Sequence, residues 1–565
     1  YLLVDAGNVD VLLKYGEAQI RRRPETSAAV QQAVSALETA LRIRRGLPSA
    51  SEMLSQLYLA VGQPADAERV ARDWFEGARD DQAALRWLVS ALVAGGKRDE
   101  AITLLEPIAR EHPDRVEVVT TLASLKLDRG PAERDAVRAM LDRLIQRCPT
   151  APLAWMGRAR FHIRTGDPKG LELARADLKA AAKLAPTDPA LLLDLGRLYV
   201  EVGQYGEAKV QFDAAEKVAP GDPAVYRVRG RTALELADTE EGAAVADRAI
   251  AAPLGSRRYD VLPLAAELYA AAGRTADARK CIDELRAADG PGEVLSYLEG
   301  LVAAEEGKPQ KAIALFEEVI RRSPRNARAY LALGRTFVRA GELRRAVFPY
   351  QESVRLAGGR AMIARIELAR VLAALGRWLD AARVAEEAHR SSPCNYLAAV
   401  TSLEMQAAVA KPNGARPDTT AIARLSAHAG RLLQEAPGDV RLRILSARLA
   451  AWQGHVQDAV AMLEPAMKDP KTRSAAALAV ADIYWDAGDL NRAAAQCRAA
   501  IDAARGNDSE VAALKARLAD VLMAGADLAG ARAVLQELIS EHGGADRSAA
   551  RLKLARFLVQ QGEPK

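Results

Sequence analysis

The sequence is poor in aromatic residues and in cysteine. Aromatic side chains make up 5% of its 565 residues, and only four cysteines are present. β-Sandwiches and β-barrels depend on aromatic and β-branched residues, so this composition argues against them. The cysteines lie far apart and none has metal-ligand spacing, which argues against a disulfide framework or a cysteine metal site. They fit a reducing compartment without excluding the periplasm.

The sequence also lacks a strong charge of one sign and a long apolar run. Its formal net charge is +5, a small excess for this length, whereas nucleic-acid-binding proteins are usually strongly basic. No apolar run reaches the roughly 18 residues of a membrane span, and no signal-peptide pattern follows Tyr1. We therefore expect neither nucleic-acid binding nor a membrane span, and the compartment stays open between cytoplasm and periplasm. Because the chain opens at Tyr1 without methionine, we interpret it as a fragment or a mature form.

Alanine, leucine and arginine are abundant, and they are arranged in a repeat. A small residue recurs five positions after a turn glycine, as in Gly62-Ala67 and Gly203-Ala208. Ten of the thirteen gaps between successive small residues are 34 or 35 residues, and such self-similarity indicates stacked supersecondary units. The small residues in this register are Ala33, Ala67, Ala101, Ala136, Ala174, Ala208, Ala243, Ala278, Ala312, Ala346, Ala381, Ala459, Ala493 and Ala531.

Each unit predicts two helices. Between residues 189 and 220, apolar residues recur at helical spacing, with a break at Gly203 between the two helical stretches. Gly196 and Ala208 are small because two helix backbones must approach closely there, and Phe212 is expected to fill the space beneath them. Proline precedes many units, and a nearby acid or amide is expected to cap the next helix, as at Asp188, Asp222 and Asn326. The pattern predicts an all-α fold.

The repeat resembles the tetratricopeptide repeat (TPR) family. The family has a 34-residue helix pair with small residues at its eighth and twentieth positions. The resemblance covers nearly the whole chain and implies a right-handed α-solenoid, the TPR superhelix, of about 15 antiparallel helix pairs. The matching pairs of small residues include Gly196/Ala208, Gly300/Ala312 and Gly334/Ala346.

Departures from the period divide the chain into three regions. Residues 1–394 are expected to form a regular array of about eleven units. Residues 395–436 are expected to form an irregular TPR-like unit, and the polar segment at 411–420 is interpreted as a loop insertion. Residues 437–565 are expected to form about three further units and then an unpaired helix over 547–561.

No catalytic, cofactor-binding or metal-binding residue is predicted. Phosphate loops and dinucleotide-binding glycine motifs are absent from the sequence. The six histidines are scattered over separate repeats and form no metal-binding pair. Nothing in a stack of repeats brings a Ser, His and Asp set together, so we expect this chain not to be an enzyme.

The resemblance implies a binding surface instead. In the TPR family, the second, fifth, ninth and twelfth positions of each unit face a concave groove. Arginine recurs at or near these positions through the array, and two tryptophans fall near them in the C-terminal units. We therefore select as candidate partner-binding residues Arg160, Arg197, Arg227, Arg231, Arg328, Arg335, Arg370, Arg448, Trp452 and Trp485.

We hypothesise that this arginine ladder binds an acidic or phosphorylated segment of a partner protein. Guanidinium groups present a planar fork that suits carboxylate and phosphate. In the alternative interpretation, the arginines form ion pairs within the solenoid and line a solvated surface. Trp452 and Trp485 could anchor an apolar side chain of the partner, whereas Trp74, Trp87 and Trp378 are expected in the core or between helices.

Three functions fit the sequence. The first is a non-catalytic scaffold that binds proteins or peptides in its groove, with self-association left open. The second is a periplasmic component of polysaccharide export or envelope assembly, which long bacterial TPR arrays often resemble. The third is the substrate-selecting region of an enzyme whose catalytic domain lies outside this chain. An upstream signal peptide would favour the second function, and a catalytic domain in the continuation would favour the third.

Overall fold

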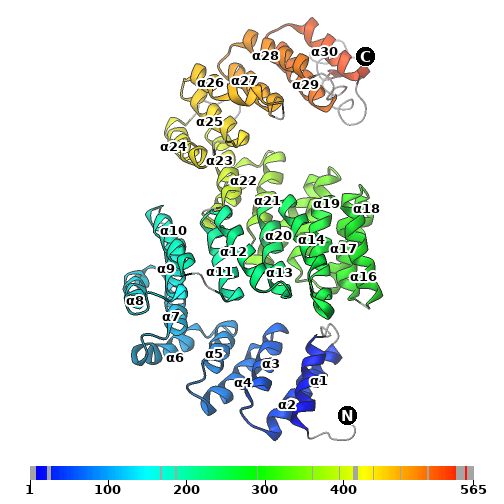
Figure 1. Ribbon diagram of the computed structural model, residues 1–565. Coiled ribbons are helices and arrows are strands. Elements are labelled where there is room, and N and C mark those ends of the chain that lie inside the picture. Colours follow the sequence, from blue (N-terminus) through cyan, green and yellow to red (C-terminus); the bar gives the residue numbers. More distant parts are fainter. Residues whose placement is uncertain are drawn as a thin grey trace. The chain divides into compact units, whose positions relative to one another are not determined.

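The protein is all-α in the part of the chain that the structure describes. The computed structural model holds thirty α-helices, two 3-10 helices and no strand within these residues (Figure 1). The helices form two compact units, residues 1–306 (unit 1) and 307–565 (unit 2). The described residues are 8–21, 27–165, 168–184, 187–288, 290–358, 361–393, 395–411, 418–436, 438–470, 472–504, 508–541, 551 and 554–555.

Unit 1 is a stack of antiparallel helix pairs, each made of a first and a second helix. A 3-10 helix precedes α8 (η1, Pro131–Glu133) and another precedes α15 (η2, Gly255–Asp260), and α17 (Gly292–Glu305) ends the unit. The pairs are α1 (Val9–Arg21) with α2 (Ser27–Ile43), α3 (Pro48–Ala60) with α4 (Pro64–Gly77), α5 (Gln82–Ala94) with α6 (Arg98–Glu111), α7 (Val116–Arg129) with α8 (Arg134–Arg147), α9 (Pro152–Thr165) with α10 (Pro168–Lys183), α11 (Pro189–Glu201) with α12 (Tyr205–Val218), α13 (Pro223–Leu236) with α14 (Thr239–Ala251), and α15 (Leu262–Ala271) with α16 (Thr275–Ala287).

Unit 2 opens with α18 (Pro309–Arg322) and continues as helix pairs. Residues 395–436, expected to be irregular, form the pair α23 and α24, while residues 412–417 of the expected insertion and most of the expected final helix lie outside the described residues. The three expected regions stay a prediction. The pairs are α19 (Ala327–Arg339) with α20 (Leu343–Ala357), α21 (Met362–Ala374) with α22 (Trp378–Ser391), α23 (Tyr396–Ala410) with α24 (Thr419–Glu435), α25 (Val440–Trp452) with α26 (Val456–Lys468), α27 (Arg473–Asp486) with α28 (Leu490–Ala503), and α29 (Asp508–Ala524) with α30 (Leu528–Glu541).

The turn between the two helices of a pair is built on a glycine in the left-handed conformation. After α11, Gly203 has a φ of 76°, and the backbone N–H of Gln204 donates to the carbonyl oxygen of Tyr199 at 2.9 Å. This bond closes a Schellman motif, in which glycine is favoured because it has no Cβ. The nine predicted turn glycines all have φ between 71° and 95°, which confirms them: Gly62, Gly96, Gly203, Gly273, Gly307, Gly341, Gly376, Gly454 and Gly488.

The predicted small residue is buried in most repeats, but two positions in the predicted register are wrong by one residue. Ala136 is exposed and Val137 is buried in its place, because the turn before α8 is built by η1. Gly242, rather than Ala243, is buried on α14, because Ala237 takes the left-handed turn position with a φ of 55°. Twelve predicted residues are at most 2% exposed: Ala33, Ala67, Ala101, Ala174, Ala208, Ala278, Ala312, Ala346, Ala381, Ala459, Ala493 and Ala531.

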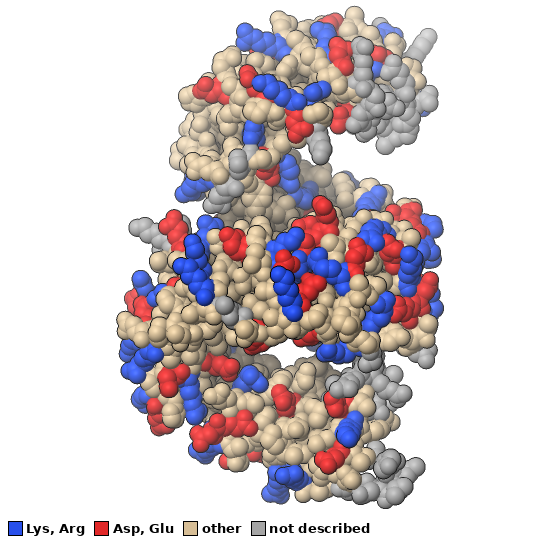
Figure 2. All heavy atoms as spheres, in the orientation of Figure 1, with Lys and Arg blue, Asp and Glu red and all other residues tan. Residues whose placement is uncertain are grey.

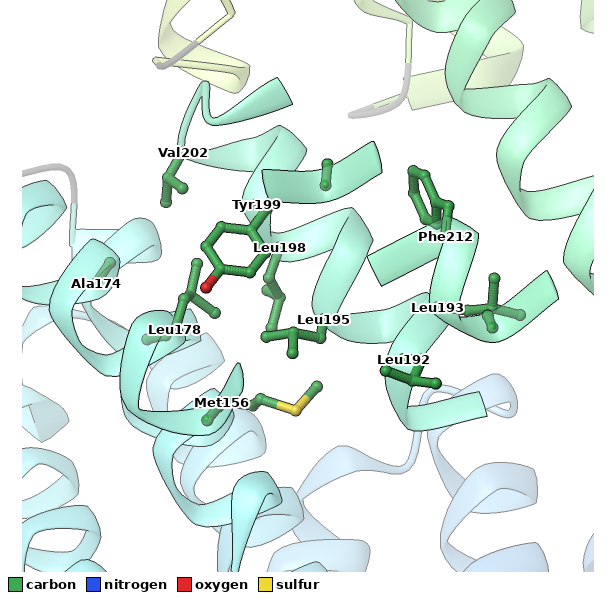
Figure 3. Close-up of a cluster of buried hydrophobic side chains, with 14 of the residues drawn as sticks. Met156, Ala174, Leu178, Leu192, Leu193, Leu195, Leu198, Tyr199, Val202 and Phe212 are labelled. Atoms are coloured by element: carbon green, nitrogen blue, oxygen red, sulfur yellow. The ribbon is translucent and has the colours of Figure 1, made fainter. Parts of the chain in front are cut away.

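The core is formed between each helix pair and the next. Figure 3 shows Leu195 and Tyr199 of α11 in one apolar cluster with Leu178 of α10 and Met156 of α9. On the other side of α11, a Cβ at Gly196 would lie 2.5 Å from the ring of Phe212, so only glycine fits there, as the sequence predicted. Because each pair packs on its neighbours in this way, the core continues along the unit. The expected caps are also confirmed, since backbone N–H groups donate to the side chains of Asp188, Asp222 and Asn326.

Candidate functional site: the first-helix surface

Within each unit, successive first helices lie side by side and form a surface. In unit 1, α9, α11, α13 and α15 pack in this order, and in unit 2, α21, α23, α25, α27 and α29 do the same. On α11, Leu195 and Leu198 point into the core, which leaves Arg197 between them exposed. We call the exposed side of these helices and of α19 the first-helix surface. All ten candidate residues lie on its helices.

In unit 1, arginines of this surface pair with carboxylates of the next first helix. Nη2 of Arg160 on α9 lies 3.1 Å from Oδ2 of Asp194 on α11. Nη1 of Arg231 on α13 lies 3.0 Å from Oε2 of Glu267 on α15. Each ion pair joins residues 34 or 36 positions apart, which is one repeat. These two arginines therefore connect neighbouring repeats.

In unit 2 the same arrangement recurs. Nε of Arg335 on α19 donates to Oε1 of Glu367 on α21 at 2.8 Å. The other carboxylate oxygen of Glu367 accepts a bond from the buried hydroxyl of Tyr350 at 2.8 Å. Burial and this carboxylate raise the pKa of Tyr350. Arg448 on α25 pairs in the same manner with Asp482 on α27.

The remaining arginines of the set are exposed. Arg197 on α11, Arg227 on α13 and Arg370 on α21 form no ion pair with another described residue. Arg328, in the first turn of α19, is exposed as well. Four of the eight arginines therefore form ion pairs between neighbouring first helices, as the second interpretation describes, and three form no ion pair with a described residue. The binding of an acidic segment by this series stays a prediction. Figure 2 shows basic and acidic side chains interspersed on the face it displays.

The two tryptophans belong to a network on α25, α27 and α29. Nε1 of Trp452 donates to Asp486 at 2.8 Å. Nζ of Lys411 pairs with the same carboxylate at 2.6 Å and lies 5.0 Å from the centroid of the Trp452 ring. The guanidinium of Arg517 lies 4.3 Å from the centroid of the Trp485 ring. Both tryptophans are partly exposed and stack with a cation, an arrangement that stabilises the cation electrostatically.

Sequence reasoning missed Lys411 and Arg517, which complete this network. Nε of Arg517 donates to Asp482 at 2.7 Å, so Asp482 lies between two arginines from the two flanking helices. Nothing in the spacing indicated Arg517, because it lies three residues before the ninth position of its own unit.

A second set of ion pairs, also missed, lies beneath the surface between helices. Arg229 on α13 is 2% exposed and contacts three carboxylates: Asp213, Glu216 and Glu241, at 2.6, 3.1 and 2.7 Å. Although burial alone raises the pKa of Glu241, the charges of Arg229 and Lys209 lower it overall. Arg158 holds the equivalent place on α9 and pairs with Asp142 and Asp177.

The described residues hold neither a metal-ligand cluster nor a helix that could span a membrane. No three His, Cys, Asp or Glu side chains gather there as a metal ion would require. In that same part of the chain, no helix combines the length and apolar character needed to traverse a bilayer.

The stacked helix pairs define a helical-repeat protein. Models of the tetratricopeptide repeat match residues 171–232, 264–327, 297–361, 331–395 and 444–508. The chain is a TPR protein with a long array, and as such it is a scaffold for protein–protein interaction whose partners are proteins. No curated protein sequence matches it.

Solved structures with a similar arrangement are distant in sequence. One is the crystal structure of the APC/C hetero-tetramer Cut9–Hcn1, at 15% identity and a TM-score of 0.41, covering 92% of this chain and 97% of that chain. Another is a tetratricopeptide repeat protein from Parabacteroides merdae ATCC 43184, at 15% identity and a TM-score of 0.37, covering 46% of this chain and 99% of that chain.

Proposed function

We propose that this scaffold binds extended segments of partner proteins along the first-helix surface, contacts their acidic residues through arginine, and has no catalytic activity of its own. One observation carries the proposal. Arg197 and Arg227 are exposed on the neighbouring helices α11 and α13, and neither forms an ion pair with another described residue. A guanidinium that is in no ion pair donates two parallel hydrogen bonds to a carboxylate or phosphate without first breaking one.

A paired arginine on the preceding first helix extends this site. Arg160 is 39% exposed and its partner Asp194 is 52% exposed, so this ion pair faces solvent. Such pairs contribute only about 0–1 kcal/mol each. A carboxylate of the partner therefore replaces Asp194 at little cost, and a segment longer than the Arg197–Arg227 pair gains a further contact.

The test reverses the two free charges. Arg197→Glu/Arg227→Glu is compared with Arg110→Glu/Arg143→Glu, which makes the same change of charge at exposed arginines on the second helices α6 and α8. Partners are isolated from native lysate with each protein, and the dissociation constant of each purified partner is measured by calorimetry. We expect at least one partner to bind the first variant at least tenfold more weakly and the control as tightly as wild type.

The proposal fails if every partner binds the two variants with dissociation constants within twofold of each other. Both variants must first show an unchanged thermal transition by circular dichroism, so that a loss of binding reports on the surface and not on folding.

A further inference from the structure

Unit 2 carries an exposed apolar patch on two successive second helices. Phe348 on α20 is 64% exposed, and Trp378 and Leu379 in the first turn of α22 are 43% and 76% exposed. We call these three residues the second-helix patch. The expectation that Trp378 lies in the core or between helices was wrong, since it begins α22 on the solvent side. Single exposed apolar residues are ordinary on a protein surface, but three large ones on adjoining elements mark an interaction site.

The repeat places the two parts of the patch side by side. Lys97, the residue just before α6, pairs with Glu68 on the preceding second helix, α4, at 2.9 Å. Arg274, just before α16, pairs with Asp247 on the preceding second helix, α14, at 2.8 Å. Arg377 holds the same place just before α22. By the same repeat geometry, the first turn of α22, which carries Trp378 and Leu379, adjoins α20, which carries Phe348.

The border of the patch keeps excess positive charge. Four arginines border the patch. Arg345 pairs with Glu342 at 2.5 Å, and Arg377 pairs with Asp380 at 2.7 Å. Of the other two, Arg344 forms no ion pair with another described residue, and Arg383 reaches Asp380 and Glu387 only at 3.8 and 4.0 Å. The bordering arginines, all exposed, are Arg344, Arg345, Arg377 and Arg383.

We propose that the second-helix patch docks an amphipathic, acidic helix of a partner protein. The apolar side of the docked helix covers Phe348 and Leu379, and the acidic residues of that helix pair with Arg344 and Arg383. Neighbouring helices lie about 8–10 Å apart, so a patch that spans two of them matches the apolar stripe of a single docked helix. The charge excess favours an acidic occupant over a basic one.

This site is independent of the first-helix surface. The second-helix patch lies on second helices, whereas the arginines of the first-helix surface lie on first helices. Unit 2 can therefore hold a helix on its second helices while an extended segment occupies its first helices, and neither partner excludes the other.

The experiment places benzoylphenylalanine at Phe348 of the full chain and irradiates the cells that produce it. The matched control carries the same probe at Val210, which is 61% exposed on a second helix of unit 1. We expect position 348 to cross-link a protein segment with at least ten times the yield of position 210. The sequence of the cross-linked segment should show apolar residues three or four positions apart, with Asp or Glu between them.

A synthetic peptide with the cross-linked sequence then serves as the ligand. We expect Phe348→Ser/Leu379→Ser and Arg344→Glu/Arg383→Glu each to weaken its binding at least tenfold, and Arg197→Glu/Arg227→Glu to leave it unchanged. Equal yields at the two probe positions overturn the proposal. So does cross-linking to lipid, to a second copy of the chain or to a basic segment, or a peptide that binds the patch variants as tightly as wild type.

Discussion

At the residue scale, the two neighbouring arginines of α13 have opposite structural roles. Arg229 is 2% exposed among three carboxylates, whereas Arg231, two residues later, is 43% exposed in a single ion pair. Removal of Arg229 takes the shared cation from Asp213, Glu216 and Glu241 and leaves Arg248 and Lys209 as the cations that still contact the two glutamates. Loss of Arg231 removes one ion pair of a more exposed cation, so it is expected to cost less. The same residue type therefore stabilises the array at one position and is available for recognition at the other.

We predict that Arg229→Met lowers the free energy of opening of α12–α14 by on the order of 3 kcal/mol. Arg231→Met, the matched control, should lower it by less than about 1 kcal/mol. Hydrogen exchange of the amides in these helices measures both values. Equal effects of the two substitutions would show that Asp213, Glu216 and Glu241 are solvated or paired elsewhere once Arg229 is removed.

His162 makes the stability of unit 1 depend on pH. It is 6% exposed, and burial lowers its pKa below the ordinary value of 6.5, with Asp177 acting in the opposite direction and Arg158 in the same one. The unfolded chain thus binds a proton at a higher pH than the folded chain does, so stability is present above about pH 6.5 and falls as the pH drops below it.

We therefore predict a lower thermal midpoint at pH 5.5 than at pH 7.5, and a smaller difference in His162→Gln. Circular dichroism melts of both proteins at both pH values test this. An unchanged difference in the variant would place the pH dependence on other groups.

The apolar side chains of the core could be predicted from the sequence, but the ion pairs between repeats could not. Gly196 and Phe212 could be paired from the sequence because both lie in one helix pair at fixed positions. The partner of Arg231 lies on the next first helix, 36 residues ahead, and that of Arg335 lies 32 residues ahead. This offset depends on how far one helix slides along the next, which periodicity alone does not determine.

At the scale of the element, the turn between paired helices shows that either glycine or alanine can adopt the same left-handed conformation. Ala237 occupies the left-handed position before α14 with a φ of 55°, and the N–H of Asp238 donates to the carbonyl oxygen of Ala233 at 2.9 Å as in the glycine turns. Without a glycine to mark it, this turn was placed one residue off in the sequence. The hydrogen-bond pattern overrides the local preference of alanine.

We predict that Ala237→Gly stabilises the protein by up to about 1 kcal/mol. A Cβ in the left-handed region is strained by about 1–2 kcal/mol, and the greater freedom of glycine in the unfolded chain cancels part of the gain from removing that strain. Gly203→Ala, the reverse change at the equivalent turn, should destabilise it by a similar amount. Thermal midpoints of the two variants provide the measurement. A destabilising effect of Ala237→Gly would mean that its methyl group makes contacts worth more than the strain.

At the scale of the whole molecule, we expect a substitution to change the stability of its own and neighbouring repeats only. Each helix pair packs on its neighbours, so stability in such arrays is close to a sum over repeats and their interfaces. We predict that Arg229→Met raises hydrogen exchange in α11–α15 and leaves α25–α29 unchanged. Mass spectrometry of exchanged peptides tests this. A uniform rise along the chain would show instead that the array unfolds as one cooperative body.

The repeat and the all-α class followed from the sequence because they depend on a period, and a period is visible in one dimension. The second-helix patch was missed because no period marks it. Its residues are exceptions to the repeat, and only their exposed fractions reveal them.

The side-by-side packing of first helices also sets a length scale. Neighbouring helices lie about 8–10 Å apart, and an extended chain advances about 3.3 Å per residue. A partner crossing α11 and α13 thus covers the step from Arg197 to Arg227 in about three residues. For the acidic partner proposed above, we therefore expect acidic residues about three positions apart where it crosses α11 and α13.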